Sequence, residues 1–447
     1  MQKIIIKNFG PVKNAEIEIT PLLVLIGEQA TGKSTIAKLI YFFKSLYIDM
    51  VKHYMEYTGS KIDFSKDLIS VTREKFFDYF GSTSFSHNFT IKYYYKKNRI
   101  IRLSLTNDRN LDVQLSTSFF SGFDRKGLND IFLLRQMNMK SANQTLDDLL
   151  SRRLELSFIR RLTASIQDLF DYNYTNLLYI VAGRNATIGY SSYYDSLLTL
   201  NLQKQKENLG SNAKEQTIDE TLMLDFLQRV SVMRQFMNKF GDFEGIIKTA
   251  YADKKEVLNT AYSFVQKVIK GTYLSGKDEK IKLDNGKFVY LKNASSGQQE
   301  SMRILQDAFI EIYSDNNIFR IIEEPEAHIF PEAQMYMLEL LAMLLNNKEE
   351  NQMIITTHSP YVLSVINNLM YAHKVGKDNP EKAGEIVNKQ SWLAPERVNA
   401  YMLTSEKGSE RIIDDELGMI KAERIDEVSR TLNEDYDKLL DIEYEKE

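Results

Sequence analysis

Eight residues near the N-terminus, Gly27 to Ser34, constrain the fold of this chain more than any other stretch. They read Gly-Glu-Gln-Ala-Thr-Gly-Lys-Ser, which has the spacing G-x-x-x-x-G-K-[ST]. Residues 22–26 before them form an apolar run of strand length, and residues 34–46 after them repeat apolar side chains at helical spacing. A glycine-rich turn between a strand and a helix N-terminus directs backbone N–H groups at one point, where the helix dipole favours negative charge. The sequence therefore predicts a phosphate-binding loop in an α/β fold.

The residues of this loop have separate expected roles. The ammonium group of Lys33 would reach the β- and γ-phosphates of a nucleotide, and the hydroxyl of Ser34 would hold Mg²⁺. The residues expected to contact the nucleotide are Gly27, Gln29, Ala30, Thr31, Gly32, Lys33, Ser34 and Thr35. Because this spacing rarely falls between a strand and a helix by chance, we expect a real nucleotide site.

Composition excludes several other kinds of chemistry. The chain has 447 residues, enough for two or three domain-sized units, and a net charge of −4 that gives no overall attraction to nucleic acid or anionic lipid. It contains no cysteine, which rules out disulfides, thiolate metal sites and cysteine nucleophiles. The N-terminal apolar stretch Ile4–Ile6 is too short for a secretion signal, and no apolar run is long enough to cross a bilayer. We expect a cytoplasmic protein.

The rest of the chain predicts strands at both ends and helices in the middle. Strands are expected at residues 3–8 and 15–19, and alternation at residues 89–105 predicts a hairpin. Apolar residues spaced by three and four predict packed helices at residues 141–170 and 220–239. The apolar run from residue 177 to 184, between these helices, reads as a buried strand that ends at a glycine.

Several polar segments leave two interpretations open. The basic hairpin turn Lys96–Arg99 could touch a nucleic-acid backbone or be solvated, and solvation is the simpler reading. Arg184 could face the nucleotide or form a surface ion pair. Residues 203–216 are polar enough for a loop. Helical spacing in residues 413–447, carried by Ile425, Val428, Leu432, Leu439 and Leu440, predicts a helix that either covers the fold or docks a partner.

An apolar strand at residues 319–322 ends in the carboxylates of Glu323 and Glu324. A phosphate loop needs such a neighbour, because one carboxylate completes the Mg²⁺ shell and another orients the attacking water. Adjacent side chains on a strand point in opposite directions, so the two are expected to have different roles. We assign Glu323 to the metal and Glu324 to the water, and expect Pro325 to turn the chain between them and the next element.

A further short strand, at residues 353–357, is followed by His358. Ligands bind at the carboxyl ends of the strands in open α/β sheets. We therefore expect His358 to lie on the same sheet edge as Glu324 and within reach of a γ-phosphate.

The chain resembles the ABC-type ATPases of the SMC, RecF and OLD kind in the order of three motifs. These are the glycine-rich loop, the strand that ends in Glu-Glu-Pro-Glu from residue 323, and the strand that ends in Thr-His-Ser-Pro from residue 357. The opening residues 5–12 are also similar to the usual start of that family, and residues 295–299, Ser-Ser-Gly-Gln-Gln, are similar to its signature, which is commonly Leu-Ser-Gly-Gly-Gln. By this resemblance, Ser296 and Gly297 would contact the γ-phosphate bound by a second subunit. Glu324 would orient the water and His358 would be the switch histidine.

The resemblance implies a two-lobed α/β ABC-type (P-loop) ATPase head with a helical insertion. The N-terminal lobe with the phosphate loop and hairpin would span residues 1–122, the mostly helical insertion residues 123–280, and the C-terminal lobe residues 281–447. ATP and Mg²⁺ would bridge the subunits of a homo-oligomer, and hydrolysis to ADP and phosphate would release them.

Within this family the likeness is closest to stand-alone ATPase subunits of bacterial anti-phage systems, the PARIS type and relatives of the OLD nucleases. It implies a sensor or scaffold that responds to a phage-encoded trigger and controls a separate effector, such as a Toprim-type nuclease. A Toprim domain is not expected in this chain, because only about 90 residues follow His358 and Asp414-Asp415-Glu416 reads as a loop. The alternatives are a RecF- or SMC-like repair ATPase that binds DNA and, less well supported, the nucleotide subunit of a transporter.

Overall fold

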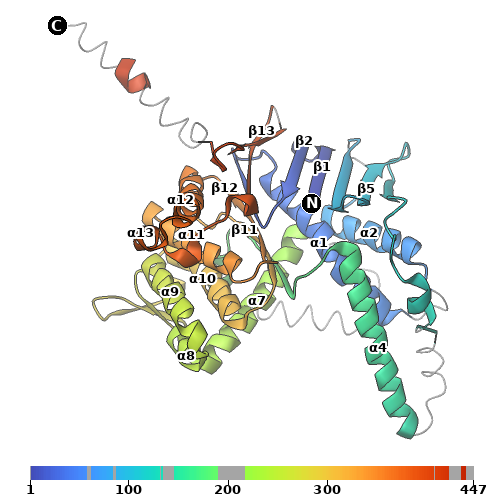
Figure 1. The fold of residues 1–447 in the computed structure, drawn as a ribbon, viewed down its shortest axis with the longest axis horizontal. Coiled ribbons are helices and arrows are strands. Elements are labelled where there is room, and N and C mark those ends of the chain that lie inside the picture. The colour runs from blue at the N-terminus through green and yellow to red at the C-terminus, as the bar shows by residue number, and fades with distance from the viewer. Residues whose placement is uncertain are drawn as a thin grey trace.

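A six-stranded sheet forms the centre of the protein (Figure 1). The computed structural model describes residues 2–57, 62–83, 87–130, 132–133, 145–189, 217–406, 408–421 and 434–438. The strands of the sheet lie in the order β14 (Gly408–Arg411), β13 (Val398–Thr404), β3 (Leu22–Gly27), β12 (Gln352–Thr357), β11 (Ile318–Glu323) and β7 (Asn176–Ile180). All neighbours are parallel except β13 and β14. The predicted α/β class and the four buried strands β3, β7, β11 and β12 are confirmed, since strands covered on both faces read as apolar runs.

Helices cover both faces of this sheet. On one face lies α1 (Lys33–Glu56), whose Lys44 contacts the ring of Phe319 in β11. On the other face lies α10 (Ser296–Ser314), whose Asp307 pairs with Arg320 of β11 at 2.6 Å. The remaining helices of this lobe are α11 (Pro331–Asn346), α12 (Pro360–Gly376) and α13 (Pro380–Ile386). Of the described helices, none has the length and hydrophobicity needed to cross a membrane.

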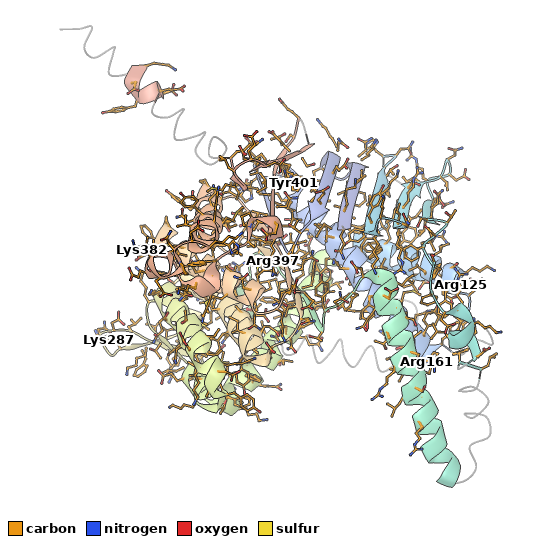
Figure 2. All side chains as sticks on the ribbon, in the orientation of Figure 1. Arg125, Arg161, Lys287, Lys382, Arg397 and Tyr401 are labelled. Carbon is orange, nitrogen blue, oxygen red and sulfur yellow. The ribbon has the colours of Figure 1, made fainter. Side chains whose placement is uncertain are left out.

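A second, antiparallel sheet packs beside the first. Its order is β2 (Val12–Ile19), β1 (Gln2–Phe9), β4 (Thr90–Lys96), β5 (Arg99–Leu105) and β6 (Leu111–Leu115), with α2 (Phe64–Phe80) beneath it. The predicted hairpin is confirmed as β4 and β5, and its turn consists of residues 97–98 alone. The backbone N–H of Glu18 donates to the hydroxyl of Tyr401 in β13 at 3.0 Å, so the two sheets are joined directly. Figure 2 labels Tyr401 beside the strands of the second sheet.

The middle of the chain is largely helical, as predicted. Its helices include α4 (Thr145–Phe170), α5 (Ala186–Gly189), α7 (Ile218–Phe240), α8 (Asp242–Thr249) and α9 (Ala252–Ile269). A small sheet follows, made of β8 (Thr272–Leu274), β9 (Lys280–Lys282) and β10 (Phe288–Tyr290). Because β7 pairs with β11, this middle segment also contributes a strand to the central sheet. The boundaries of the helical insertion, placed at residues 122 and 280 from the sequence, therefore remain a proposal.

The start of the C-terminal segment differs from the prediction. Residues 413–420 lie in the segment expected to be helical, but they form a small hairpin of β15 (Ile413–Asp414) and β16 (Met419–Ile420). Its turn contains Asp415 and Glu416, two of the three residues that were expected to form a loop. The reason is local: Asp414 Oδ1 accepts the N–H groups of Glu416 and Leu417, and Gly418 adopts a φ of 66°, which together close a tight turn. Residues 434–438 are helical and exposed. The five apolar residues that carried the helix prediction, and residues 203–216, lie outside the described residues.

Lys44 of α1 is buried, and no carboxylate of the described residues lies at hydrogen-bonding distance from it. Its Nζ donates to Gln2 Oε1 at 2.6 Å and to the hydroxyl of Tyr174 at 3.2 Å. Burial lowers the pKa of Lys44 to about 7, against the weaker opposing effect of Asp171. The ordinary pKa is 10.5, so between these pH values the unfolded chain binds a proton that the folded chain does not, and raising the pH stabilises the folded state.

We expect Lys44→Met to remove this pH dependence. Each pKa unit of difference corresponds to about 1.4 kcal/mol, so wild-type stability should gain about 2 kcal/mol from this group between pH 7 and pH 9, and the variant should not. Urea unfolding of both proteins at the two pH values measures the difference. Parallel pH profiles would show that Lys44 is not the group that titrates.

Candidate nucleotide-binding site

The predicted phosphate loop connects β3 to α1 and requires glycine at two positions. Gly27, with a φ of 156°, leaves so little room that a Cβ atom would lie 2.3 Å from the carbonyl oxygen of Leu403. Gly32 caps α1 in the left-handed region, with a φ of 95°, and a Cβ atom there would lie 2.4 Å from a methyl group of Val12. Any side chain at either position would displace the loop.

Lys33, the first residue of α1, folds back over this loop. Its Nζ donates to the carbonyl oxygens of Gly27 at 2.8 Å and Glu28 at 2.7 Å. Burial lowers the pKa of Lys33, while the charges of Glu324 and Glu326 oppose this shift. The lysine predicted to bind phosphate therefore lies within the electrostatic field of the predicted catalytic strand end. Ser34, the predicted metal ligand, is exposed at the start of the helix.

Glu323 ends β11 on the face that α1 covers. Its Oε1 accepts the hydroxyl of Tyr179 at 2.7 Å, and its Oε2 accepts the N–H of Ala182 at 3.0 Å. The ring of Tyr179 packs edge-on against Tyr41 of α1. The two hydrogen bonds fix the orientation of the Glu323 carboxylate. Each of its oxygens still has a lone pair for another partner. The role of Tyr179 could not be foreseen from the sequence, which gave it only as part of an apolar strand.

Glu324 occupies a turn with unusual backbone geometry. Its φ is 44°, which residues other than glycine rarely adopt. Its N–H donates to the carbonyl oxygen of Thr356 at 2.8 Å, which ties the turn to β12. The chain therefore turns at Glu324 itself, one residue before the predicted position at Pro325. The side chains of Glu323 and Glu324 consequently have different surroundings, as expected.

His358 and Glu324 lie together, as predicted. The Nε2 atom of His358 is 3.6 Å from Oε1 of Glu324, and both side chains are partly exposed. Glu326 positions the end of β12: its Oε1 accepts the hydroxyl of Thr357 at 2.5 Å and the N–H of His358 at 3.0 Å. Sequence reasoning assigned no role to Glu326. Its place in the Glu-Glu-Pro-Glu motif was the only available signal.

One family of known proteins matches most of the chain. Residues 1–363 match the family described as the AAA ATPase domain. The chain belongs to this family. No curated protein matches the sequence.

Three solved structures show a weaker likeness. One is the SMC head domain from Thermotoga maritima, with 11% identity, a TM-score of 0.31, and coverage of 81% of this chain and 90% of that chain. The recombination mediator RecF of the RecFOR pathway, in its ATPrS form, has 10% identity, a TM-score of 0.34, and coverage of 92% and 97%. Its ATP form has 11% identity, a TM-score of 0.26, and coverage of 92% and 98%.

In this AAA ATPase domain, Arg184 has a place that neither sequence interpretation anticipated. The left-handed turn at Gly183, with a φ of 68°, directs the arginine inward, where it is fully buried. Its guanidinium donates to the carbonyl oxygens of Glu300, Glu323 and Glu324, each at 2.8 Å. It is therefore not a surface group, and it holds backbone atoms of the site.

The signature-like segment of this AAA ATPase domain begins α10. Ser295 is the N-cap, and its hydroxyl accepts the N–H of Gln298 in a capping box. Ser296 is exposed and Gly297 is buried. A Cβ atom on Gly297 would lie 2.4 Å from the carbonyl oxygen of His328, so the glycine allows α10 to pack against the loop that follows Glu324.

The basic turn between β4 and β5 is occupied by ion pairs. Lys96 and Arg99 contact Asp168 of α4 at 3.1 and 2.9 Å. Arg99 also donates to the carbonyl oxygen of Ser121 at 3.2 Å. Two of the three basic side chains of the turn thus have partners within the protein, which reduces the positive charge available to a nucleic-acid backbone.

Proposed function

We propose that this protein binds ATP with Mg²⁺ and hydrolyses it to ADP and phosphate. The observation that carries the proposal is the meeting of Glu324 and His358, 3.6 Å apart, at the carboxyl ends of strands next to the loop that bears Lys33. Lys33 would exchange the carbonyl oxygens of Gly27 and Glu28 for phosphate oxygens. Glu324 would orient and deprotonate the attacking water, and His358 would contact the γ-phosphate. Positioning and electrostatic stabilisation are the main contributions to such a reaction.

The residues of the site fit Mg²⁺. No group of three or more His, Cys, Asp or Glu side chains in the described part of the chain could hold a metal by itself. Mg²⁺ commonly takes one or two protein ligands and completes its shell with phosphate oxygens and water. The exposed hydroxyl of Ser34 and the free lone pairs of Glu323 would be those ligands. Bound there, the ion would neutralise charge on the β- and γ-phosphates.

We further propose an SMC- and RecF-like mode of action, in which ATP joins two copies through the signature segment. Support comes from the exposure of Ser296 at the helix N-terminus, where phosphate is favoured. Gly297 lies beneath it against the loop after Glu324. A neighbouring copy's γ-phosphate would contact both residues.

Ser296→Arg is expected to abolish ATP-driven association and leave the fold intact. The exposed position accepts the larger side chain, but its bulk would block the approach of a second copy's phosphate. Light scattering with ATP, on the Glu324→Gln background to prevent turnover, measures the effect.

Ala252→Arg is a matched control, because Ala252 is also the exposed first residue of a helix. The C-terminal residue of that helix, Ile269, accepts a hydrogen bond from Gln298, so Ala252 lies about 25 Å from the signature. Association that survives Ser296→Arg would mean that the segment is only a helix cap.

The finer proposal is that ATP turnover controls a separate effector in phage defence. The RecF-like alternative, a repair ATPase that binds DNA, is supported by the same site. Titration of duplex DNA at several salt concentrations separates them, because phosphate contacts make binding fall steeply with salt. Strong salt-dependent binding that changes with ATP would favour repair. Effector control would be favoured if the protein does not bind DNA in this way but captures, in the presence of ATP, a nuclease encoded beside it.

A further inference from the structure

The side chain of Arg184 joins three parts of the proposed hydrolysis site. It leaves the end of β7 and is fully buried. Its Nε donates to the carbonyl oxygen of Glu300 in α10, and its Nη1 and Nη2 donate to those of Glu323 and Glu324 at the end of β11. One planar guanidinium therefore connects the signature helix with the backbone of both proposed functional carboxylates.

The backbone that Arg184 holds determines the direction of the Glu324 side chain. Glu324 has a φ of 44°, a conformation that persists only where surrounding contacts enforce it. Three hydrogen bonds do so: its N–H donates to the carbonyl oxygen of Thr356, and its carbonyl oxygen accepts the N–H of Ala327 and the guanidinium of Arg184. Arg184 is the one of these three partners that also contacts α10, so its loss would release the Glu324 carbonyl oxygen from that helix.

The other end of the connection directly follows the signature segment, one helical turn after Ser296. Glu300 is the fourth residue after Ser296. Its carbonyl oxygen accepts a hydrogen bond from Nε of Arg184, and its carboxylate Oε2 lies 3.4 Å from the same nitrogen. A ligand that shifts the start of α10 would therefore shift an acceptor of Arg184.

We propose that Arg184 is a positioning residue that couples the signature end of α10 to the carboxylate of Glu324. Hydrolysis would then be fast only when Ser296 and Gly297 are engaged. This inference rests on the proposed ATP hydrolysis.

Arg320 provides a matched control within the same three elements. It is also fully buried, and it contacts Asp307 and Glu311 of α10 and the carbonyl oxygen of Asn176 in β7. It lies three residues before Glu323, about 10 Å along β11, and contacts neither carboxylate. Loss of its guanidinium should weaken the packing of these elements without altering the catalytic turn.

The test compares Arg184→Lys with Arg320→Lys. Lysine keeps the charge but replaces a planar fork of five donors with one ammonium group. We expect Arg184→Lys to lower kcat about 10–100-fold, as for a misplaced catalytic group, with the Kd for ATP nearly unchanged. Arg320→Lys should lower thermal stability at least as much and keep kcat close to wild type. Equal losses of kcat in the two variants would overturn the coupling.

Two further measurements make the result independent of folding. Arg184→Lys added to Glu324→Gln should slow turnover little further, because both changes affect one step; fully additive losses would indicate a general structural effect. If Arg184→Lys does not fold, Glu300→Gln decides alone: a several-fold loss of kcat is expected, and an unchanged kcat overturns the coupling. A wild-type protein that binds no ATP would instead refute the proposed function.

Discussion

Glu324→Gln is expected to slow ATP hydrolysis by about 10²–10³-fold while ATP binding persists. Removing one group that acts on the transition state costs about 3–4 kcal/mol. Glutamine has nearly the same shape, and backbone contacts with Thr356, Ala327 and Arg184 hold position 324, so the turn should be preserved. Phosphate release and a titration with a fluorescent ATP analogue measure the two properties separately.

Glu332→Gln is a suitable control for that experiment. Glu332 is an exposed carboxylate in the first turn of α11, eight residues further along the chain, and no site contact depends on it. Its replacement should leave turnover unchanged. A Glu324→Gln protein that hydrolyses ATP at the wild-type rate would show that another group activates the water.

Lys33→Ala should weaken ATP binding on the order of 100-fold, because a hydrogen bond to a charged group contributes about 1.5–3 kcal/mol. The fold should tolerate the change, since within the described part of the chain Nζ bonds only to the carbonyl oxygens of Gly27 and Glu28. Isothermal titration with Mg²⁺ and ATP measures the loss.

Lys38→Ala tests whether the loss is specific to Lys33. Lys38 lies further along α1 and pairs with Asp219 at 2.5 Å. The Lys38→Ala substitution therefore removes one positive charge from α1, as Lys33→Ala does, but outside the loop at residues 27–34. Similar losses of affinity in both variants would mean that net charge, rather than the phosphate contact, determines binding.

The sequence predicted the elements whose signals are local. The glycine-rich turn, the buried strand before it and the long helix after it could be predicted because their residue types and spacing are contiguous. The closeness of Glu324 and His358 also followed, because parallel strands bring their carboxyl ends to one edge.

Features that depend on distant parts of the chain could not be predicted. Arg184 contacts Glu300, 116 residues away, through a turn whose direction depends on the positive φ of Gly183. Tyr179 holds Glu323 across 144 residues. The helix predicted from residue 413 onward rested on apolar residues from 425 to 440, which carry no signal for the hairpin at residues 413–420 that Asp414 closes. In each case the deciding partner is a tertiary contact or a specific turn that has no periodic signal.

The most direct test of the account is a single-turnover measurement on the purified protein. Radiolabelled ATP is bound with Mg²⁺ to excess protein, and the nucleotide on the protein is analysed over time. We expect wild type to convert bound ATP to ADP and phosphate, Glu324→Gln to retain ATP, and Lys33→Ala to hold far less nucleotide than wild type at the same protein concentration. Conversion of ATP by Glu324→Gln at the wild-type rate, or equal binding by Lys33→Ala, would contradict the proposed function.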